Sequence, residues 1–185
     1  MQVEADETIE TRRLSLRPVT YADAANVMAL AGEWDVARML ADMPFPMSLD
    51  LARSWTETAV GDKSYAITFN GVMIGGLSVC AIEPVLSPET SELGFWLGKT
   101  WWGRGFAREA GAAALIRHRS RNASTAFSSG HFADNPASGR VLRALGFTQI
   151  GVVRQWCLAR QETLPAIRFE LGPQPRRAHW EQVDR

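Results

Sequence analysis

Within residues 91–115, a short apolar run is followed directly by a loop with two glycines and then by an alanine-rich stretch. The run ELGFWL at 92–97 is consistent with a buried strand. We expect a helix from about Arg104 to Arg119, because small residues recur on one of its faces and let it pack closely on a sheet. A strand that leads through a glycine loop into a close-packed helix indicates an α/β domain.

The remaining pattern places strands and helices on both sides of this unit. The dipeptide Asn70-Gly71 between two apolar runs predicts a hairpin with a type I′ turn, because both turn residues need positive φ. The order of elements indicates an α/β fold with a mixed sheet in a single domain over residues 1–172, followed by a tail at 173–185. The predicted strands cover 9–17, 64–69, 72–82, 92–97, 125–131, 147–153 and 166–171, and the predicted helices cover 20–33, 33–41, 48–60, 104–119 and 136–145.

Two nucleotide-binding motifs compete for the glycine loop, and the spacing excludes both. LGKT at 97–100 resembles the end of a Walker A loop, but Leu93 stands where that motif needs a glycine, five positions before Gly98. In the dinucleotide fingerprint G-x-G-x-x-G/A, counted from Gly103, the last position is Arg108. The loop therefore belongs to neither class.

Two interpretations of the loop WGRGFA at 102–107 stay open from the residues alone. Gly103 and Gly105 can point successive backbone N–H groups at an anion, and the start of the following helix adds a partial positive charge. Arg104 and Arg108 would supply formal charge for a pyrophosphate. Alternatively, the glycines only form a turn that lets the helix approach the strand.

A second motif, NPASGRVLRALGF at 135–147, lies at a junction between a strand and a helix. Asn135 is predicted to cap the helix, and Pro136 to occupy its first position. Gly146 ends the helix, and Phe147 begins the next strand. An asparagine at such a junction is usually only a helix cap. This motif therefore indicates a function only in combination with the glycine loop.

Together, the two motifs resemble those of the GNAT superfamily of N-acetyltransferases, of the RimJ/RimL type. The resemblance extends from TRRLSLRPVT at 11–20 to the last strands. The family's acetyl-CoA loop reads Arg/Gln-x-x-Gly-x-Gly/Ala, and Gly105 and Ala107 match its glycine and its small residue. Trp102 stands at the Arg/Gln position, where an aromatic residue is common in the RimJ/RimL branch. The family's downstream signature, Asn-x-x-Ser/Ala followed by Gly-Phe, matches the second motif.

The resemblance implies a mostly antiparallel, twisted sheet that splays at its fourth strand, 92–97, so that acetyl-CoA inserts beside this strand. Backbone groups near Trp96 and Leu97 would bond the pantetheine amides, and an N–H there would face the thioester oxygen. The implied acetyl-CoA-binding residues are Trp96, Leu97, Trp102, Gly103, Arg104, Gly105, Phe106, Ala107, Arg108 and Asn135.

The same resemblance implies two catalytic residues. Glu92 matches a strand glutamate that acts in related enzymes through a water or by holding the cationic substrate. Alternatively, Glu92 is a strand-edge carboxylate paired with an arginine. Many family members carry a tyrosine as the acid where this chain has Leu142, whereas RimL-like enzymes use the hydroxyl three residues after the asparagine. Ser138 occupies that place, and its alternative role is to cap the helix.

Composition and charge narrow the classes of partner. The twenty basic and twenty acidic residues balance, so no overall field attracts nucleic acid, and we expect no direct nucleic-acid partner. The first ten residues lack the features of a signal peptide, and no apolar run approaches the roughly 20 residues of a membrane span. We therefore expect a cytoplasmic protein with no membrane partner. Cys80 and Cys157 are expected to be free thiols, and the lack of a Cys/His cluster argues against a metal site.

The predicted function is acetyl-CoA-dependent transfer of an acetyl group to a primary amine, and the alternative is a non-catalytic acyl-CoA-binding or regulatory module. The acceptor, a protein N-terminus or a small-molecule amine, is expected to meet segments 20–60, 83–91 and 154–166. The aromatic residues of these segments are expected to fill the core rather than line a cleft: Trp34, Phe45, Trp55 and Trp156. The resemblance also permits a homodimer.

Overall fold

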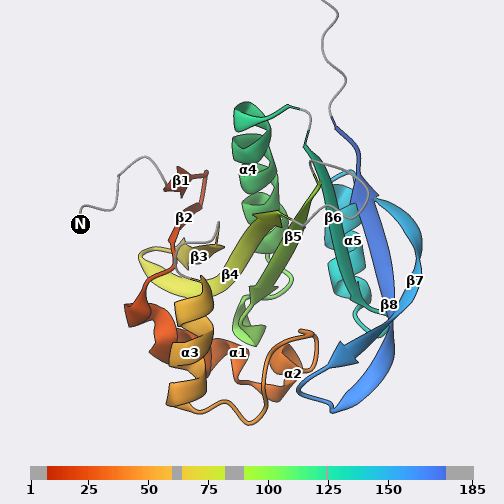
Figure 1. Cartoon of the computed structure of the whole chain (residues 1–185). Coiled ribbons are helices and arrows are strands. Elements are labelled where there is room, and N and C mark those ends of the chain that lie inside the picture. The colour runs from red at the N-terminus through yellow and green to blue at the C-terminus, as the bar shows by residue number, and fades with distance from the viewer. Residues whose placement is uncertain (1–7, 60–63, 82–89, 124, 174–185) are drawn as a thin grey trace, which may run out of the picture.

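In the computed structural model, eight strands form one sheet within residues 8–59, 64–81, 90–123 and 125–173, the parts of the chain that the structure describes (Figure 1). The strands follow the order β1-β2-β3-β4-β5-β6-β8-β7 along the sheet, and all neighbours are antiparallel except β5 and β6. The strands are β1 (Ile9–Glu10), β2 (Leu14–Pro18), β3 (Ser64–Phe69), β4 (Val72–Ala81), β5 (Thr90–Leu97), β6 (Ala126–Phe132), β7 (Thr148–Cys157) and β8 (Glu162–Leu171).

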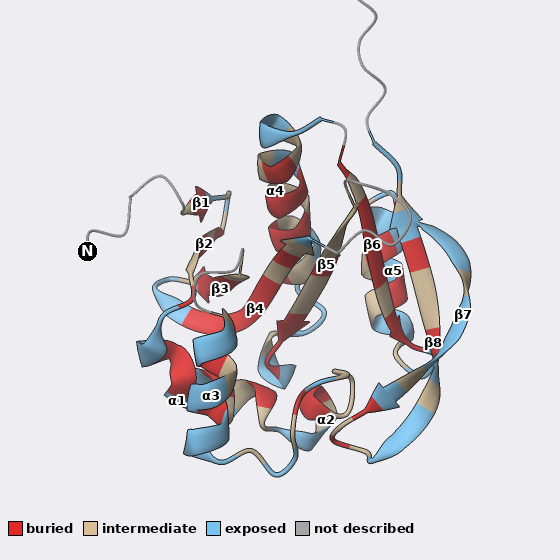
Figure 2. Cartoon of the chain, in the orientation of Figure 1, coloured by how far each residue is buried: buried red, intermediate tan, exposed pale blue. Residues whose placement is uncertain are grey.

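Helices cover both faces of this sheet, so the domain has three layers. One apolar core lies between the sheet and helices α4 and α5, around Phe127 and Phe169, and a second lies under helices α1 to α3, around Val27 and Ala52. Figure 2 shows the buried residues along the central strands and on the inner sides of the helices. The helices are α1 (Ala24–Ala31), α2 (Trp34–Ala37), α3 (Leu49–Ala59), α4 (Phe106–Arg121) and α5 (Pro136–Ala144), with short 3₁₀ turns at Tyr21–Asp23 and Lys99–Trp101.

Strand β5 separates from its parallel neighbour after three paired residues. It stays antiparallel to β4 from Ser91 to Leu97, but it pairs with β6 only over Thr90–Glu92. The two strands diverge beyond this point (Figure 1). The mixed sheet and the splay predicted for the strand at 92–97 are therefore confirmed. This strand is the fifth rather than the fourth because the predicted first strand is in fact two.

The prediction of one strand over 9–17 is wrong, because β1 and β2 form a hairpin in which Ile9 lies opposite Leu16. The side chain of Thr11 stabilises the turn between them. Its hydroxyl accepts from the Leu14 N–H at 2.8 Å, while its backbone N–H donates to the Leu14 carbonyl at 2.9 Å. Such a turn depends on one side chain, and the alternation of apolar residues does not reveal it.

The other predicted elements agree with the structure in type, and the strand predicted at 64–69 has the bounds of β3, but most others differ in length. Asn70 and Gly71 have φ values of 49° and 78°, as a type I′ turn requires. Strands β7 and β8 stay paired as far as Cys157 and Glu162, so the loop expected at 154–166 is mostly a hairpin. The helix expected at 33–41 is reduced to the four residues of α2.

Some predictions fall outside the described residues, namely most of the tail at 173–185 and most of the loop at 83–91. Cys80 and Cys157 are not joined to each other by a disulfide, as predicted. Within the described ranges, no helix is both long enough and apolar enough to span a membrane. In the same ranges, no three His, Cys, Asp or Glu side chains come together as a metal site requires.

Substitution of Gly75 by alanine tests how closely β4 and β5 approach. A Cβ at Gly75 would lie 2.2 Å from the Trp96 carbonyl oxygen, whereas a Cβ at Gly151 would meet no atom within 4 Å. We expect Gly75→Ala to lower the free energy of unfolding by about 1–3 kcal/mol, and the control Gly151→Ala to change it by less than about 0.5 kcal/mol. Urea unfolding measures both, and equal midpoints for the two variants would contradict the close approach.

Candidate active site

A cleft of about 1030 Å³ lies where β5 and β6 separate, and the first turns of two helices border it. Gly103 and Gly105 line it just before α4, and Asn135 and Ser138 line it at the start of α5. The N-terminus of a helix carries a partial positive charge and unpaired N–H groups. This side of the cleft therefore suits an anionic ligand.

The same cleft reaches the opposite face of the sheet. Successive side chains of a strand point to opposite faces, so Leu93 and Leu97 join the core under α4 and α5, whereas Trp96 joins the core under α1 to α3. Glu92 shares the face of Trp96, and it lines the cleft together with Arg168 of β8. A cleft lined from both faces lets two ligands meet in the opening of the sheet.

The glycine loop has the conformation and the space of a ligand-binding turn. Gly103 and Gly105 have φ values of 74° and 78°, in the left-handed region that favours glycine. Gly105 is the N-cap residue of α4. A Cβ at Gly103 would meet no atom within 4 Å, so close packing against the protein is not the reason for this glycine. Both interpretations of the loop require the left-handed backbone, and the open space beside Gly103 leaves room for a ligand.

Trp102 joins the glycine loop to the end of β5. Its indole Nε1 donates to the Leu97 carbonyl at 2.7 Å, while 44% of the residue stays exposed. Phe106 is buried in the core on the α4 side, and Ala107 and Arg108 line the cleft. Arg104 is the exception among the predicted loop residues: it is not part of the cleft lining, and its guanidinium lies 5.1 Å from the centre of the Trp101 ring.

A contact between the first hairpin and α4 holds the loop from behind, and the sequence analysis missed it. Arg13 donates from Nη1 to the Arg104 carbonyl at 3.1 Å, and its guanidinium lies 4.5 Å from the centre of the Phe106 ring. Glu109 accepts hydrogen bonds from the Arg13 Nε at 2.7 Å, the Arg13 N–H at 2.8 Å and the Thr11 hydroxyl at 2.7 Å. Arg13 and Glu109 are 96 positions apart, so no local pattern could have linked them.

The hydrogen-bond pattern of β5 decides which backbone groups face the opening. The Gly98 N–H donates to a β4 carbonyl at 2.9 Å. Bonded residues alternate along an antiparallel pair, so Trp96 also bonds toward β4. Phe95 and Leu97 turn their N–H and C=O groups away from β4, as the contact between the Leu97 carbonyl and the Trp102 indole illustrates. The sequence analysis named Trp96 for this role and missed Phe95.

The start of α5 has the predicted cap. The Asn135 side-chain oxygen accepts from the Ser138 N–H at 3.3 Å, and Pro136 occupies the first helical position. The cap uses the side-chain oxygen of Asn135. The amide N–H groups of Asn135 and the hydroxyl of Ser138 therefore keep their capacity to bond a ligand. Leu142 is fully buried, so the side chain at the usual tyrosine position does not reach the cleft.

His131 also lines the cleft, and the sequence analysis did not single it out. Its Nδ1 lies 2.7 Å from the Phe132 carbonyl oxygen. A carbonyl only accepts, so Nδ1 carries a proton, and in the neutral ring Nε2 holds the lone pair. Nε2 is buried, and it has no hydrogen-bond partner among the described residues. A Cβ at Gly139 would lie 2.6 Å from Nε2, so this glycine makes room for the ring.

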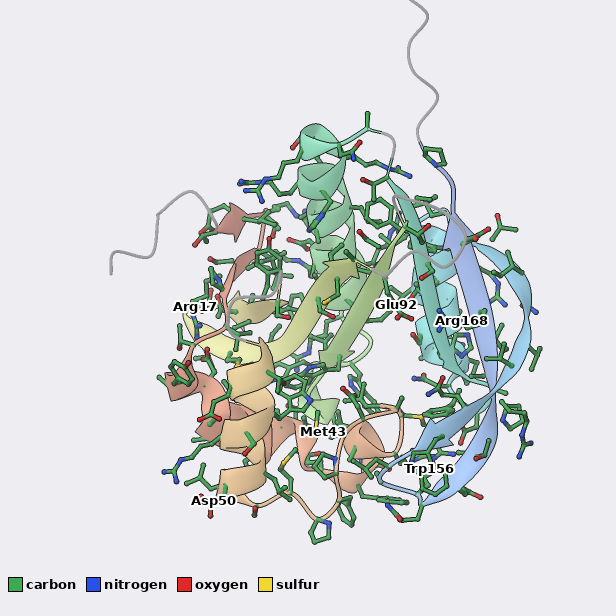
Figure 3. The ribbon with its side chains drawn as sticks, viewed as in Figure 1. Arg17, Met43, Asp50, Glu92, Trp156 and Arg168 are labelled. Atoms are coloured by element: carbon green, nitrogen blue, oxygen red, sulfur yellow. The ribbon has the colours of Figure 1, made fainter. Side chains whose placement is uncertain are left out.

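Glu92 forms an ion pair at the opening of the sheet. Its Oε1 lies 3.0 Å from Nη1 of Arg168, and the two side chains are 45% and 29% exposed. Figure 3 shows them beside one another between β5 and β8. This is the arginine-paired carboxylate that stood as the alternative for Glu92, but here the pair lines a cleft and stays accessible to a ligand.

The expectation that four aromatic residues fill the core is wrong for three of them. Trp34, Phe45 and Trp156 are 44%, 43% and 47% exposed, and Figure 3 labels Trp156 near the β7–β8 turn. Trp34 and Phe45 pack mainly on each other, with ring centroids 4.9 Å apart. Trp55 does pack against the core, edge-on to Trp96. None of the four lines the cleft.

Comparison with protein families gives one match. The family model described as "Acetyltransferase (GNAT) domain" matches residues 13–148. This range begins at the arginine behind the glycine loop and includes that loop, Glu92 and the start of α5. No curated protein sequence gives a significant match.

Many solved structures share this fold, and three of them illustrate it. A GNAT-family acetyltransferase from Bacillus anthracis aligns with a TM-score of 0.77 at 17% identity, over 89% of this chain and 98% of that chain. RimL, a ribosomal L7/L12 α-N-protein acetyltransferase in complex with coenzyme A, aligns with a TM-score of 0.76 at 23% identity, over 90% and 98%. The microcin C7 self-immunity acetyltransferase MccE, in complex with acetyl-CoA and AMP, aligns with a TM-score of 0.74 at 19% identity, over 88% and 93%.

Substitution of Glu109 tests the contact behind the glycine loop. Burial raises the pKa of Glu109, but the hydrogen bonds from Thr11 and Arg13 outweigh this effect and hold the pKa below its usual value. A carboxylate with a lowered pKa in the folded state adds stability above its unfolded pKa of about 4.3. That contribution is lost as the pH falls through the folded value. We therefore expect Glu109→Gln to be less stable than the native protein at pH 7.

The difference between the two proteins should shrink between about pH 5 and pH 2. Urea unfolding across this range measures it, and substitution of the exposed Glu57 by glutamine serves as the matched control. A constant difference at all pH values, or an equal effect of Glu57→Gln, would contradict the assignment.

Proposed function

Since this chain belongs to the GNAT acetyltransferase family, we propose that it transfers an acetyl group from acetyl-CoA to a primary amine, by direct attack while both ligands are bound. The observation that carries this proposal is the cleft through the opening of the sheet. Two helix N-termini line it on one face, and an accessible carboxylate lines it on the other. RimL and MccE, which share the fold, were solved with coenzyme A and with acetyl-CoA.

The glycine loop fits the pyrophosphate of acetyl-CoA. Gly103 and Gly105 hold the backbone in a left-handed conformation, with open space beside Gly103, and the first turn of α4 adds unpaired N–H groups. Arg104 and Arg108 would supply positive charge. In this proposal Trp102 and Arg13 keep the loop in position rather than bind the ligand.

The edge of β5 fits the extended pantetheine arm. The backbone groups of Phe95 and Leu97 face the opening, and we expect them to bond the amides of the arm in the manner of an added strand. Asn135, at the start of α5, would contribute its side-chain amide from the other side of the cleft. An N–H at this edge of β5 would face the acetyl oxygen, where negative charge develops during the attack.

When bound, acetyl-CoA supplies the acetyl group: a C–N bond forms to the amine, the thioester C–S bond breaks, the amine loses a proton, and the thiolate gains one. Glu92 would accept the proton of the ammonium group, directly or through a water, or hold the cation before the proton leaves. Ser138 would donate a proton toward the sulfur from the start of α5. The two residues line the same cleft from opposite faces of the sheet.

The kind of amine decides how much is required of Glu92. An α-amine with a pKa of about 7.7–8.0 costs about 1 kcal/mol to present in its neutral form at pH 7, whereas a lysine side chain at about 10.4 costs about 4.6 kcal/mol. The α-amine of a protein N-terminus is therefore easier to present in its neutral form than a lysine side chain. RimL is described as a ribosomal L7/L12 α-N-protein acetyltransferase, so protein N-termini belong among the acceptors to test.

Release of coenzyme A thiol tests the proposed function. We expect acetyl-CoA to yield free thiol in the presence of at least one class among protein N-termini, free amino acids, polyamines and aminoglycosides. A non-catalytic acyl-CoA-binding module is the alternative, since Leu142 replaces the usual tyrosine acid. Such a module would bind acetyl-CoA but release no thiol with any amine.

Charge reversal at Arg104 tests the glycine loop. We expect Arg104→Glu to weaken acetyl-CoA binding by at least about tenfold, because it puts a negative charge beside the pyrophosphate. Calorimetric titration of acetyl-CoA measures the affinity. Arg53→Glu, on the exposed surface of α3, gives the same change in net charge and should leave the affinity unchanged. Equal affinities for both variants would exclude Arg104 from the pyrophosphate site.

Removal of the Ser138 hydroxyl tests the proton donor. We expect Ser138→Ala to lower the acetylation rate by at least about tenfold while the affinity for acetyl-CoA stays nearly unchanged. Ser138→Thr keeps a hydroxyl and should retain more activity than the alanine variant. If turnover by Ser138→Ala equals that of the native protein, Ser138 is not the proton donor and has only a structural role at the start of α5.

A further inference from the structure

The ion pair between Glu92 and Arg168 stands at the point where the sheet opens. Glu92 is the last residue of β5 that pairs with β6, and Arg168 belongs to β8, on the other side of β6. Between them, Gly130 of β6 lies opposite Arg168. A Cβ at Gly130 would lie 3.1 Å from the Arg168 Nη1 and 3.3 Å from its Cδ. The glycine therefore leaves room for the arginine side chain to cross β6 and reach Glu92.

Fold stability is a weak reason for this arrangement. An ion pair between partly exposed groups typically contributes about 0–1 kcal/mol, and both side chains are partly exposed. The contact joins one carboxylate oxygen to one guanidinium nitrogen, so each group keeps hydrogen-bonding capacity for a ligand. The cleft thus presents a negative and a positive group side by side, on the face opposite the glycine loop.

We propose that this pair binds the acceptor as a free α-amino acid, with Glu92 at its amino group and Arg168 at its carboxylate. The inference rests on the proposed acetyltransferase function and names its substrate class. In a free α-amino acid both groups are attached to one carbon, so their spacing suits two protein groups that are 3.0 Å apart. A guanidinium is well suited to a carboxylate, because it donates two parallel hydrogen bonds.

Other classes of amine fit this side of the cleft less well. Arg168 repels a polyamine or an aminoglycoside. Of the two further acids that line the cleft, Asp134 already pairs with Arg38 and Arg160 at 3.4 and 2.8 Å, which leaves Asp42 for any additional cationic group. A peptide N-terminus places a neutral carbonyl where an amino acid has its carboxylate, so it forgoes the charge on Arg168.

The segment 38–41 bounds the same side and favours a small acceptor. Leu40 and Ala41 line the cleft. The Leu158 N–H donates to the Ala41 carbonyl at 2.8 Å, and the Arg160 Nε donates to the Arg38 carbonyl at 2.8 Å. These bonds fasten the segment to the β7–β8 turn, so a bound amine meets a fixed wall.

Matched pairs of acceptors test the proposal: each standard L-amino acid as the free acid and as its α-amide, with thiol release as the measurement. We expect at least one free acid to exceed its amide in kcat/KM by about tenfold or more, because only the acid has a charged partner for Arg168. Arg168→Gln should remove this preference. Arg154→Gln, on the neighbouring strand and outside the cleft lining, should keep it.

A second variant and a binding measurement make the test independent of turnover. Gly130→Ala crowds the arginine without removing its charge, and it should also reduce the preference for the acid. Without acetyl-CoA, the preferred free acid should raise the melting temperature of the native protein more than its amide does. Arg168→Gln should lose this difference.

The outcomes separate the two proposals. Amides or peptides that react as well as the free acids, or a preference for the acid that persists in Arg168→Gln, would overturn the amino-acid assignment and leave the acetyltransferase function standing. No thiol release with any amine, including peptides and polyamines, would overturn the proposed function itself.

Discussion

The separation of β5 from β6 after Glu92 is the constraint on which the rest of the site depends. A buried backbone group needs a hydrogen-bond partner, and beyond Glu92 the side of β5 that faces away from β4 has no neighbouring strand. The Trp102 indole bonds the Leu97 carbonyl, the Ser129 hydroxyl donates to the Leu93 carbonyl at 2.7 Å, and the backbone groups of Phe95 face the cleft. Because α4 and α5 both begin near this opening, their positive ends border the same space that the strands leave.

Several glycines serve this opening, each for a different physical reason. Gly103 and Gly105 supply the left-handed backbone of the loop. Gly75 lets β4 approach β5, and Gly130 lets Arg168 cross a strand. A larger residue would strain the backbone at the first two positions, move a strand at the third and displace a charged side chain at the fourth. The chain thus uses its smallest residue to shape both the loop and the opposite wall of the cleft.

Features that depend on neighbours in sequence could be predicted, and features that depend on distant parts of the chain could not. The Asn70-Gly71 turn and the Asn135 cap each depend on a few neighbouring residues, and the structure confirms both. The glycine loop does join β5 to α4 as expected, but its ligand stays a prediction. The contact of Glu92 with Arg168 links β5 to β8 through the order of strands, which no local pattern contains. The exposure of Trp34 and Trp156 could not be predicted either. The residue type alone does not show whether a tryptophan is buried, because burial depends on which distant segments pack against it. The catalytic and ligand-binding roles of the predicted site residues stay predictions.

The bonds from Arg13 to Arg104 and Glu109 have a consequence for the order of folding. Loop closure between residues 96 positions apart is entropically unfavourable, and long-range contacts of this kind slow folding. Until the first hairpin docks on α4, the glycine loop lacks the Arg13 hydrogen bond to the Arg104 carbonyl and the guanidinium beside the Phe106 ring. Under the proposed function, affinity for a pyrophosphate would then report whether the first hairpin has docked.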